Sequence, residues 1–104
     1  MTTDPTVSWP SMDHVLIIHS VRDYAAWKQV FDEAAALRRR AGELSYQLLR
    51  DEHDANRVVH FSRWTSLAEA RAFFESPGLE EIRRRAGVEA PEFNYLHGLE
   101  QGTL

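Results

Sequence analysis

The sequence predicts an α+β domain whose elements follow the order βαββαβ. Short runs rich in β-branched and aromatic residues alternate with longer stretches in which apolar residues recur every three or four positions. A cluster of turn residues joins the second and third runs, and the 104 residues fit one domain. Right-handed crossovers then give a ferredoxin-like antiparallel sheet of strand order 4-1-3-2, with the helices on one face.

The first strand and the first helix are predicted from 14–20 and 24–41. The strand segment HVLIIHS is short and rich in β-branched residues, and Asp23 follows as an N-cap. Gly42 suits the position just after the helix end. The stripe that defines the helix contains Tyr24, Trp27, Phe31, Ala34 and Arg38.

A hairpin is predicted next, with strands at 44–50 and 57–64 joined by the turn segment DEHDAN at 51–56. Ser66 and Glu69 then form a capping box, the clearest local signal of a helix start.

The second helical region is predicted to break at Pro77-Gly78 and to resume from Leu79 to Ala86. The last strand is expected at 93–99. The polar segment 1–12 is predicted to be a flexible arm, and 13–104 to be a single ferredoxin-like domain.

Composition narrows the classes of function. The net charge of −4 and the lack of a long basic run argue against nucleic acid or an anionic membrane surface as a partner. The chain has no cysteine, which excludes disulfides, thiolate nucleophiles and thiolate-bound zinc. It has neither an 18-residue apolar run nor an apolar N-terminal signal, so we expect a cytoplasmic protein without a membrane span.

Alternation along the first and third strands sorts their side chains onto two faces. One set is purely apolar, and we assign it to the helix side: Leu16, Ile18, Val59 and Phe61. The other set mixes apolar and polar residues: Val15, Ile17, His19, Val58, His60, Ser62 and Trp64. This mixed face is too apolar for open water and too polar for an ordinary dry core, which predicts that a second sheet or a ligand covers it. We therefore expect a dimer that encloses a cavity between two sheets, a dimeric α+β barrel.

Several segments together resemble a known family: VLIIHSV, DYAAWKQVFDEAAALRRRAG, SYQLLR and VVHFSRWTSLAEARAFFESPGLEEIRRRAGV. Over roughly residues 14–99 they are similar to the dimeric α+β barrel superfamily, near the antibiotic biosynthesis monooxygenase branch. The resemblance implies a homodimer that holds a small hydrophobic or aromatic molecule. Its members include cofactor-free oxygenases, haem-degrading enzymes and cyclases.

His19 and His60 are the candidate catalytic residues, because an imidazole titrates near working pH and can act as a general base. They could instead simply hydrogen-bond each other, water or the partner subunit. The candidate substrate contacts are Trp64, Ser62, Tyr46, Tyr95, His97 and Ile17. If His97 points inward, three imidazoles converge and could bind a divalent metal, but no close His-x-His spacing supports this, and we expect no metal.

The resemblance implies a cofactor-independent oxygenase in which a histidine deprotonates an aromatic or polyketide-like substrate that then reacts with O₂. We expect no cofactor. Haem is not expected, because Arg83 or a neighbour falls where the haem-degrading branch has its iron-ligating histidine. The alternatives are a non-catalytic ligand-binding or stress-associated dimer, and a cyclase or isomerase that uses the same base.

Overall fold

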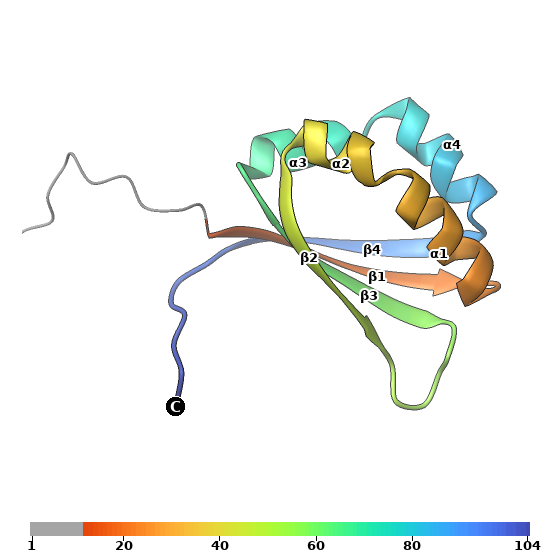
Figure 1. Ribbon diagram of the computed structural model, residues 1–104, viewed down its shortest axis with the longest axis horizontal. Helices are drawn as coiled ribbons and strands as arrows, with labels where there is room; N and C mark the ends of the chain where they lie inside the picture. The colour runs from red at the N-terminus through yellow and green to blue at the C-terminus, as the bar shows by residue number, and fades with distance from the viewer. Residues whose placement is uncertain (1–11) are drawn as a thin grey trace, which may run out of the picture.

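The computed structural model describes residues 12–104, which form one antiparallel sheet with all the helices packed on one side of it (Figure 1). The strands lie in the order β2-β3-β1-β4, which confirms the predicted topology. The predicted arm over 1–12 falls almost wholly outside the described residues. The elements are β1 (Asp13–Val21), α1 (Tyr24–Glu33), α2 (Ala35–Ala41), β2 (Glu43–Arg50), β3 (Arg57–Trp64), α3 (Leu67–Phe74), α4 (Pro77–Arg85) and β4 (Val88–His97).

The first helical region starts where predicted but is divided in two. Asp23 caps α1 by accepting a hydrogen bond from the amide of Ala25 at 3.2 Å. The helix turns at Ala34, and α2 continues to Ala41. Gly42 ends α2 with φ at +125°, a conformation that favours glycine, and a Cβ there would lie 2.5 Å from Thr65 Oγ1. This glycine brings the chain directly from α2 into β2.

The second helical region also follows the predicted signals. The amide of Glu69 donates to Ser66 Oγ at 3.1 Å, which confirms the capping box. Helix α4 begins at Pro77 rather than at the predicted Leu79, because proline suits the first helical turn, where its missing N–H would have no partner. Strand β4 starts five residues earlier than predicted, and its pairing with β1 shifts register between Ile18 and Ser20.

The two faces of the sheet are assigned in the opposite sense to the sequence-based prediction. The mixed set lies under the helices, where Ile17 and Trp64 are fully buried and His19 and His60 are 5% and 2% exposed. The purely apolar set is only partly covered and, by alternation along the paired strands, lies on the face away from the helices. The prediction was wrong because it counted polarity alone, whereas the helices supply aromatic rings and polar partners that accommodate buried histidines.

A β-bulge at the start of β2 aims one acidic side chain into the core. Glu43 pairs with Trp64 and Ser45 pairs with Arg63, so Leu44 is an extra residue in this strand. The side chain of Glu43 is therefore buried on the helix side, whereas Leu44 is half exposed. None of the helices in residues 12–104 has the length and hydropathy needed to span a bilayer.

Candidate active site

A cavity of about 60 Å³ lies between the sheet and the helices. Both candidate catalytic histidines line it, His19 from β1 and His60 from β3. The rest of its wall is mostly apolar and comes from α1, α3, α4, β4 and the turns beside them: Trp27, Val30, Phe31, Ala34, Phe74, Leu79, Ile82, Arg83, Ala86, Val88 and Phe93. The two histidines therefore line a cavity within one chain, whereas the sequence predicted that they face a cavity between two sheets.

His19 is a buried neutral imidazole. Its Nδ1 is buried and has no hydrogen-bond partner among the described residues, and its ring packs against Trp27 with centroids 5.4 Å apart. Burial, followed by the charges of His60 and Arg83, lowers the pKa of His19 to about 3. A neutral ring with an unsatisfied nitrogen at a cavity wall is suited to hydrogen-bond a ligand.

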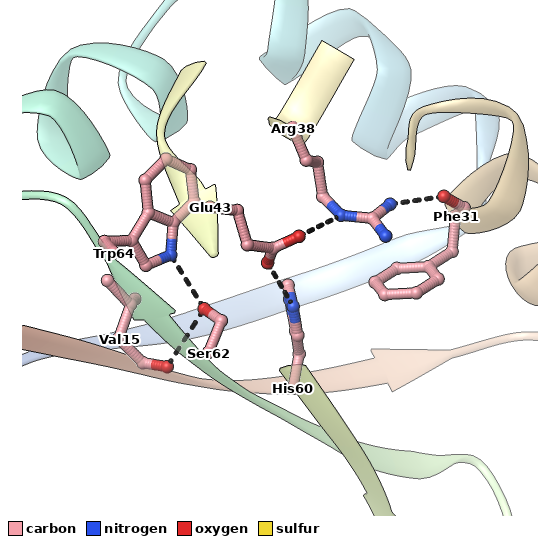
Figure 2. A network of polar contacts seen from close by, with 7 residues as sticks. All are labelled: Val15, Phe31, Arg38, Glu43, His60, Ser62 and Trp64. Carbon is pink, nitrogen blue, oxygen red and sulfur yellow. Dashed lines mark hydrogen bonds and ion pairs between the residues drawn. The ribbon is translucent and has the colours of Figure 1, made fainter. Parts of the chain in front are cut away.

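His60 belongs to a buried charged network that begins on α2 (Figure 2). Its Nε2 lies 2.8 Å from Glu43 Oε2, and Arg38 Nε donates to Glu43 Oε1 at 2.6 Å. The guanidinium of Arg38 also donates to the carbonyl oxygen of Phe31. The three charged or titratable side chains thus form a chain from helix to sheet, with the histidine at the cavity end.

The network keeps Glu43 ionised in the core. Burial opposes this ionisation, but the close polar contacts and charges of His60 and Arg38 outweigh burial, so that the pKa of Glu43 is lowered. The contact between Glu43 and His60 is close but not well aligned for a hydrogen bond. An ionised carboxylate at this distance could stabilise positive charge on the imidazole ring.

Arg83 supplies a positive charge at the cavity wall. Its Nη1 donates to the carbonyl oxygen of Phe74 at 3.0 Å, and its guanidinium lies 5.1 Å from the ring centroid of Phe93. Burial lowers the pKa of Arg83, but the group stays charged at any physiological pH. The cavity therefore combines two imidazoles and one cation in an otherwise apolar wall.

Three predicted substrate contacts lie in the core beside the cavity rather than on its wall. Trp64 Nε1 donates to Ser62 Oγ at 2.8 Å, and Ser62 donates in turn to the carbonyl oxygen of Val15 at 3.4 Å (Figure 2). Ile17 is packed in the same cluster as Trp64. In this conformation these side chains pack in the core beside the cavity and do not line it.

The other three predicted contacts are more peripheral. Tyr46 is half exposed, and its ring lies 6.1 Å from that of His60. Tyr95 is partly buried beside Phe93. His97 is exposed and pairs with Asp13 at 2.8 Å, far from the cavity lining, so the alternative with three converging histidines is wrong. Residues 12–104 contain no group of three or more side chains placed to hold a metal ion.

Arg38 and Glu43 are the site residues that sequence reasoning missed. Arg38 did carry a signal, since it falls on the apolar stripe of the first helix, and a charged residue at a buried position requires a partner. Glu43 carried none, because strict alternation would have placed it on the other face and only the bulge turns it inward.

We expect the buried neutral His19 to make stability fall in mild acid. The unfolded chain protonates this residue below its ordinary pKa of 6.5, whereas the folded chain does so only near 3. The unfolded state then binds more protons, so the free energy of unfolding falls as the pH drops from 6.5 toward 3, by about 1.4 kcal/mol per pH unit at most. Urea unfolding of wild type and His19→Leu between pH 6.5 and 5 checks this, and parallel pH curves would contradict it.

The comparisons with known proteins agree with this architecture. SnoaB, a cofactor-independent oxygenase from Streptomyces nogalater, superposes with a TM-score of 0.71 at 20% identity over 88% of this chain and 96% of that one. The monooxygenase of the gene ActVA-Orf6 of Streptomyces coelicolor, in complex with nanaomycin D, gives 0.63 at 16% identity over 91% and 94%. No curated protein matches the chain in sequence. The family model described as antibiotic biosynthesis monooxygenase matches residues 23–85, more than half of the sequence, and the chain belongs to this family.

Proposed function

We propose that this protein is a cofactor-independent monooxygenase that acts on an aromatic or polyketide-like C–H acid, with His60 as the general base. The observation that carries the proposal is the pairing of His60 with Glu43 at the wall of a largely apolar cavity. His60 would accept the proton, and the neutral His19 would hydrogen-bond the substrate. Family membership supports the reaction class.

The chemistry needs only substrate, O₂ and a base. His60 takes a proton from an activated CH₂ group and leaves a resonance-stabilised carbanion. The carbanion gives electrons to O₂, a C–O bond forms, and the returning proton completes a hydroperoxide. Loss of water then leaves a carbonyl, so that the sum is R₂CH₂ + O₂ → R₂C=O + H₂O. Arg83 is suited to stabilise negative charge on the substrate as it develops.

The size of the cavity sets a condition on this proposal. Its volume of about 60 Å³ is well below the roughly 150 Å³ of an engineered protein cavity that binds benzene. An aromatic substrate therefore requires the wall to open. Leu79, Ile82 and Arg83 form the α4 side of that wall, and an outward displacement of this helix would enlarge the cavity.

The test is oxygen uptake by the purified, chelator-treated protein with a panel of aromatic C–H acids such as anthrones. We expect O₂ consumption equal to product formed, and with ¹⁸O₂ one labelled atom in the new carbonyl and the other in water. Ile82→Trp should abolish turnover by filling the cavity. Glu81→Trp, which adds the same bulk on the exposed side of α4, should leave turnover intact.

The outcomes separate the alternatives. Conversion of a substrate without O₂ uptake would replace oxygenation by a cyclase or isomerase reaction. If a ligand binds, Ile82→Trp blocks its binding and no conversion occurs, the result would favour a non-catalytic binding protein. The small volume of the cavity is the observation that supports this alternative. A cytoplasmic location remains part of the proposal.

We also propose that the uncovered face of the sheet pairs with a second copy of the chain. Leu16 lies opposite Phe61, and Ile18 lies opposite Val59, so four apolar residues form one patch across β1 and β3. Leu49 on β2 extends the patch and is half exposed. A contiguous apolar patch of this kind on a small domain is typical of a protein–protein interface.

Replacing Phe61 with glutamate is expected to convert the dimer into a monomer, because it places a charge at the centre of the patch, where pairing would bury it. Sedimentation velocity or light scattering measures the change in mass. Leu99→Glu is the matched control, since Leu99 is fully exposed and lies after β4. A wild-type protein that is monomeric at high micromolar concentration would contradict the proposal.

A further inference from the structure

We propose that Glu43 is a positioning residue that fixes the tautomer of His60, with the hydrogen on Nε2 and the lone pair on Nδ1. This inference rests on the proposed function, which needs an imidazole able to accept a proton in the cavity. In this proposal the Glu43 carboxylate determines the orientation of the His60 ring and which nitrogen carries the hydrogen, and Arg38 holds the carboxylate in place.

The argument begins with what a carboxylate can do. An ionised carboxylate only accepts hydrogen bonds, so the nitrogen facing it must carry the hydrogen. Nε2 of His60 faces Glu43 Oε2 at 2.8 Å. A neutral imidazole has a single N–H, and its hydrogen on Nε2 leaves the lone pair on Nδ1. Within residues 12–104 the only polar contact of this ring is the one with Glu43, and His60 lines the cavity, where the lone pair could meet a ligand.

Arg38 fixes the orientation of the Glu43 carboxylate. It holds the other carboxylate oxygen, Glu43 Oε1, through Nε at 2.6 Å. Its Nη1 is committed to the carbonyl oxygen of Phe31, and its side chain is buried. Because a guanidinium has no acceptor, the carboxylate is kept ionised and aimed at His60. The misalignment of the contact is typical of catalytic hydrogen bonds before substrate binds.

The second histidine shows the contrast. His19 has no carboxylate partner, and its buried Nδ1 lacks any hydrogen bond in the described part of the chain. Nothing selects its tautomer, and it avoids taking up a proton until about pH 3. The two histidines of one cavity are thus set up for different tasks, and Glu43 is what distinguishes them.

The experiment is ¹H–¹⁵N correlation spectroscopy of the histidine rings in the free protein at pH 7.5, with His60 assigned from His60→Gln. In the wild type we expect the hydrogen of His60 on Nε2. In Glu43→Gln we expect the opposite tautomer. Arg38 would hold the amide oxygen, so the amide NH₂ would face Nε2 and move the hydrogen to Nδ1. Glu43→Asp should restore the wild-type tautomer, and the exposed Glu75→Gln should not disturb it.

The kinetic consequence is a fall in kcat of roughly 10²–10⁴-fold in Glu43→Gln with little change in KM, because a wrong tautomer removes the base and leaves the binding surface in place. A wild-type His60 that carries its hydrogen on Nδ1, or on both nitrogens at pH 7.5, would overturn the proposal, as would an unchanged tautomer in Glu43→Gln. Since the spectra need no substrate, a confirmed tautomer switch in a protein without oxygenase activity would reject the proposed function and leave the positioning role standing.

Discussion

Replacing His60 with glutamine is expected to lower turnover by roughly 10²–10⁴-fold, the usual contribution of a general base. Glutamine is close to histidine in size, and its amide nitrogen can still donate to Glu43, so the buried carboxylate keeps a partner. It cannot take up the substrate proton. The measurement is kcat with an active C–H acid, together with a urea unfolding curve to verify that the variant folds.

Two further histidine variants test whether the loss of turnover is specific to His60. His53 lies in the exposed turn between β2 and β3, and His53→Gln should have the activity of the wild type. His19→Gln should raise KM more than it lowers kcat, because we expect His19 to bind substrate and not to accept its proton. If His19→Gln loses turnover while His60→Gln retains it, the two roles are the reverse of those proposed.

Replacing Arg38 with methionine is expected to lower the free energy of unfolding by about 3–5 kcal/mol, the usual consequence of removing one partner from a buried ion pair. Methionine fills a similar volume, but the ionised Glu43 would then lie in the core with only His60 beside it. A loss of this size is a large fraction of the stability of a small domain. Urea unfolding at pH 7 measures it.

The double variant Arg38→Met/Glu43→Leu separates charge from packing. Removing both charges should regain most of the lost stability, since apolar replacements of buried ion pairs are often neutral or stabilising. Its activity should stay low, because His60 would lose its carboxylate. A single Arg38→Met variant within about 1 kcal/mol of the wild type would contradict the view that this pair is buried and ionised.

The fold could be predicted from local signals because most of its elements carry their own start and stop. The cap at Asp23, the glycine at Gly42 and the capping box at Ser66 each set a boundary that the structure confirms. The start of β4 was missed, because Pro91 suggested an irregular segment. An edge strand tolerates proline, however, and β4 lies at the edge of the sheet.

The composition of the site was easier to predict than its place. Period-two alternation correctly grouped His19, His60 and Trp64 on one face, but it could not say which face the helices cover. That choice depends on long-range packing, in which the rings of Trp27 and Phe31 lie against the two histidines. The partner Glu43 depends on a one-residue bulge, which leaves no mark on the local pattern.

The cavity is lined by residues of a single chain, and the apolar patch proposed for pairing lies on the opposite face of the sheet. Each copy would therefore carry a complete set of reactive groups. In dimers that combine one active and one inactive subunit, the active subunit would keep its full activity. Total activity would then be proportional to the fraction of active subunits. A mutation that inactivates one gene copy would then reduce activity in proportion and would not be dominant-negative. Two subunits with different substrates could also form one dimer.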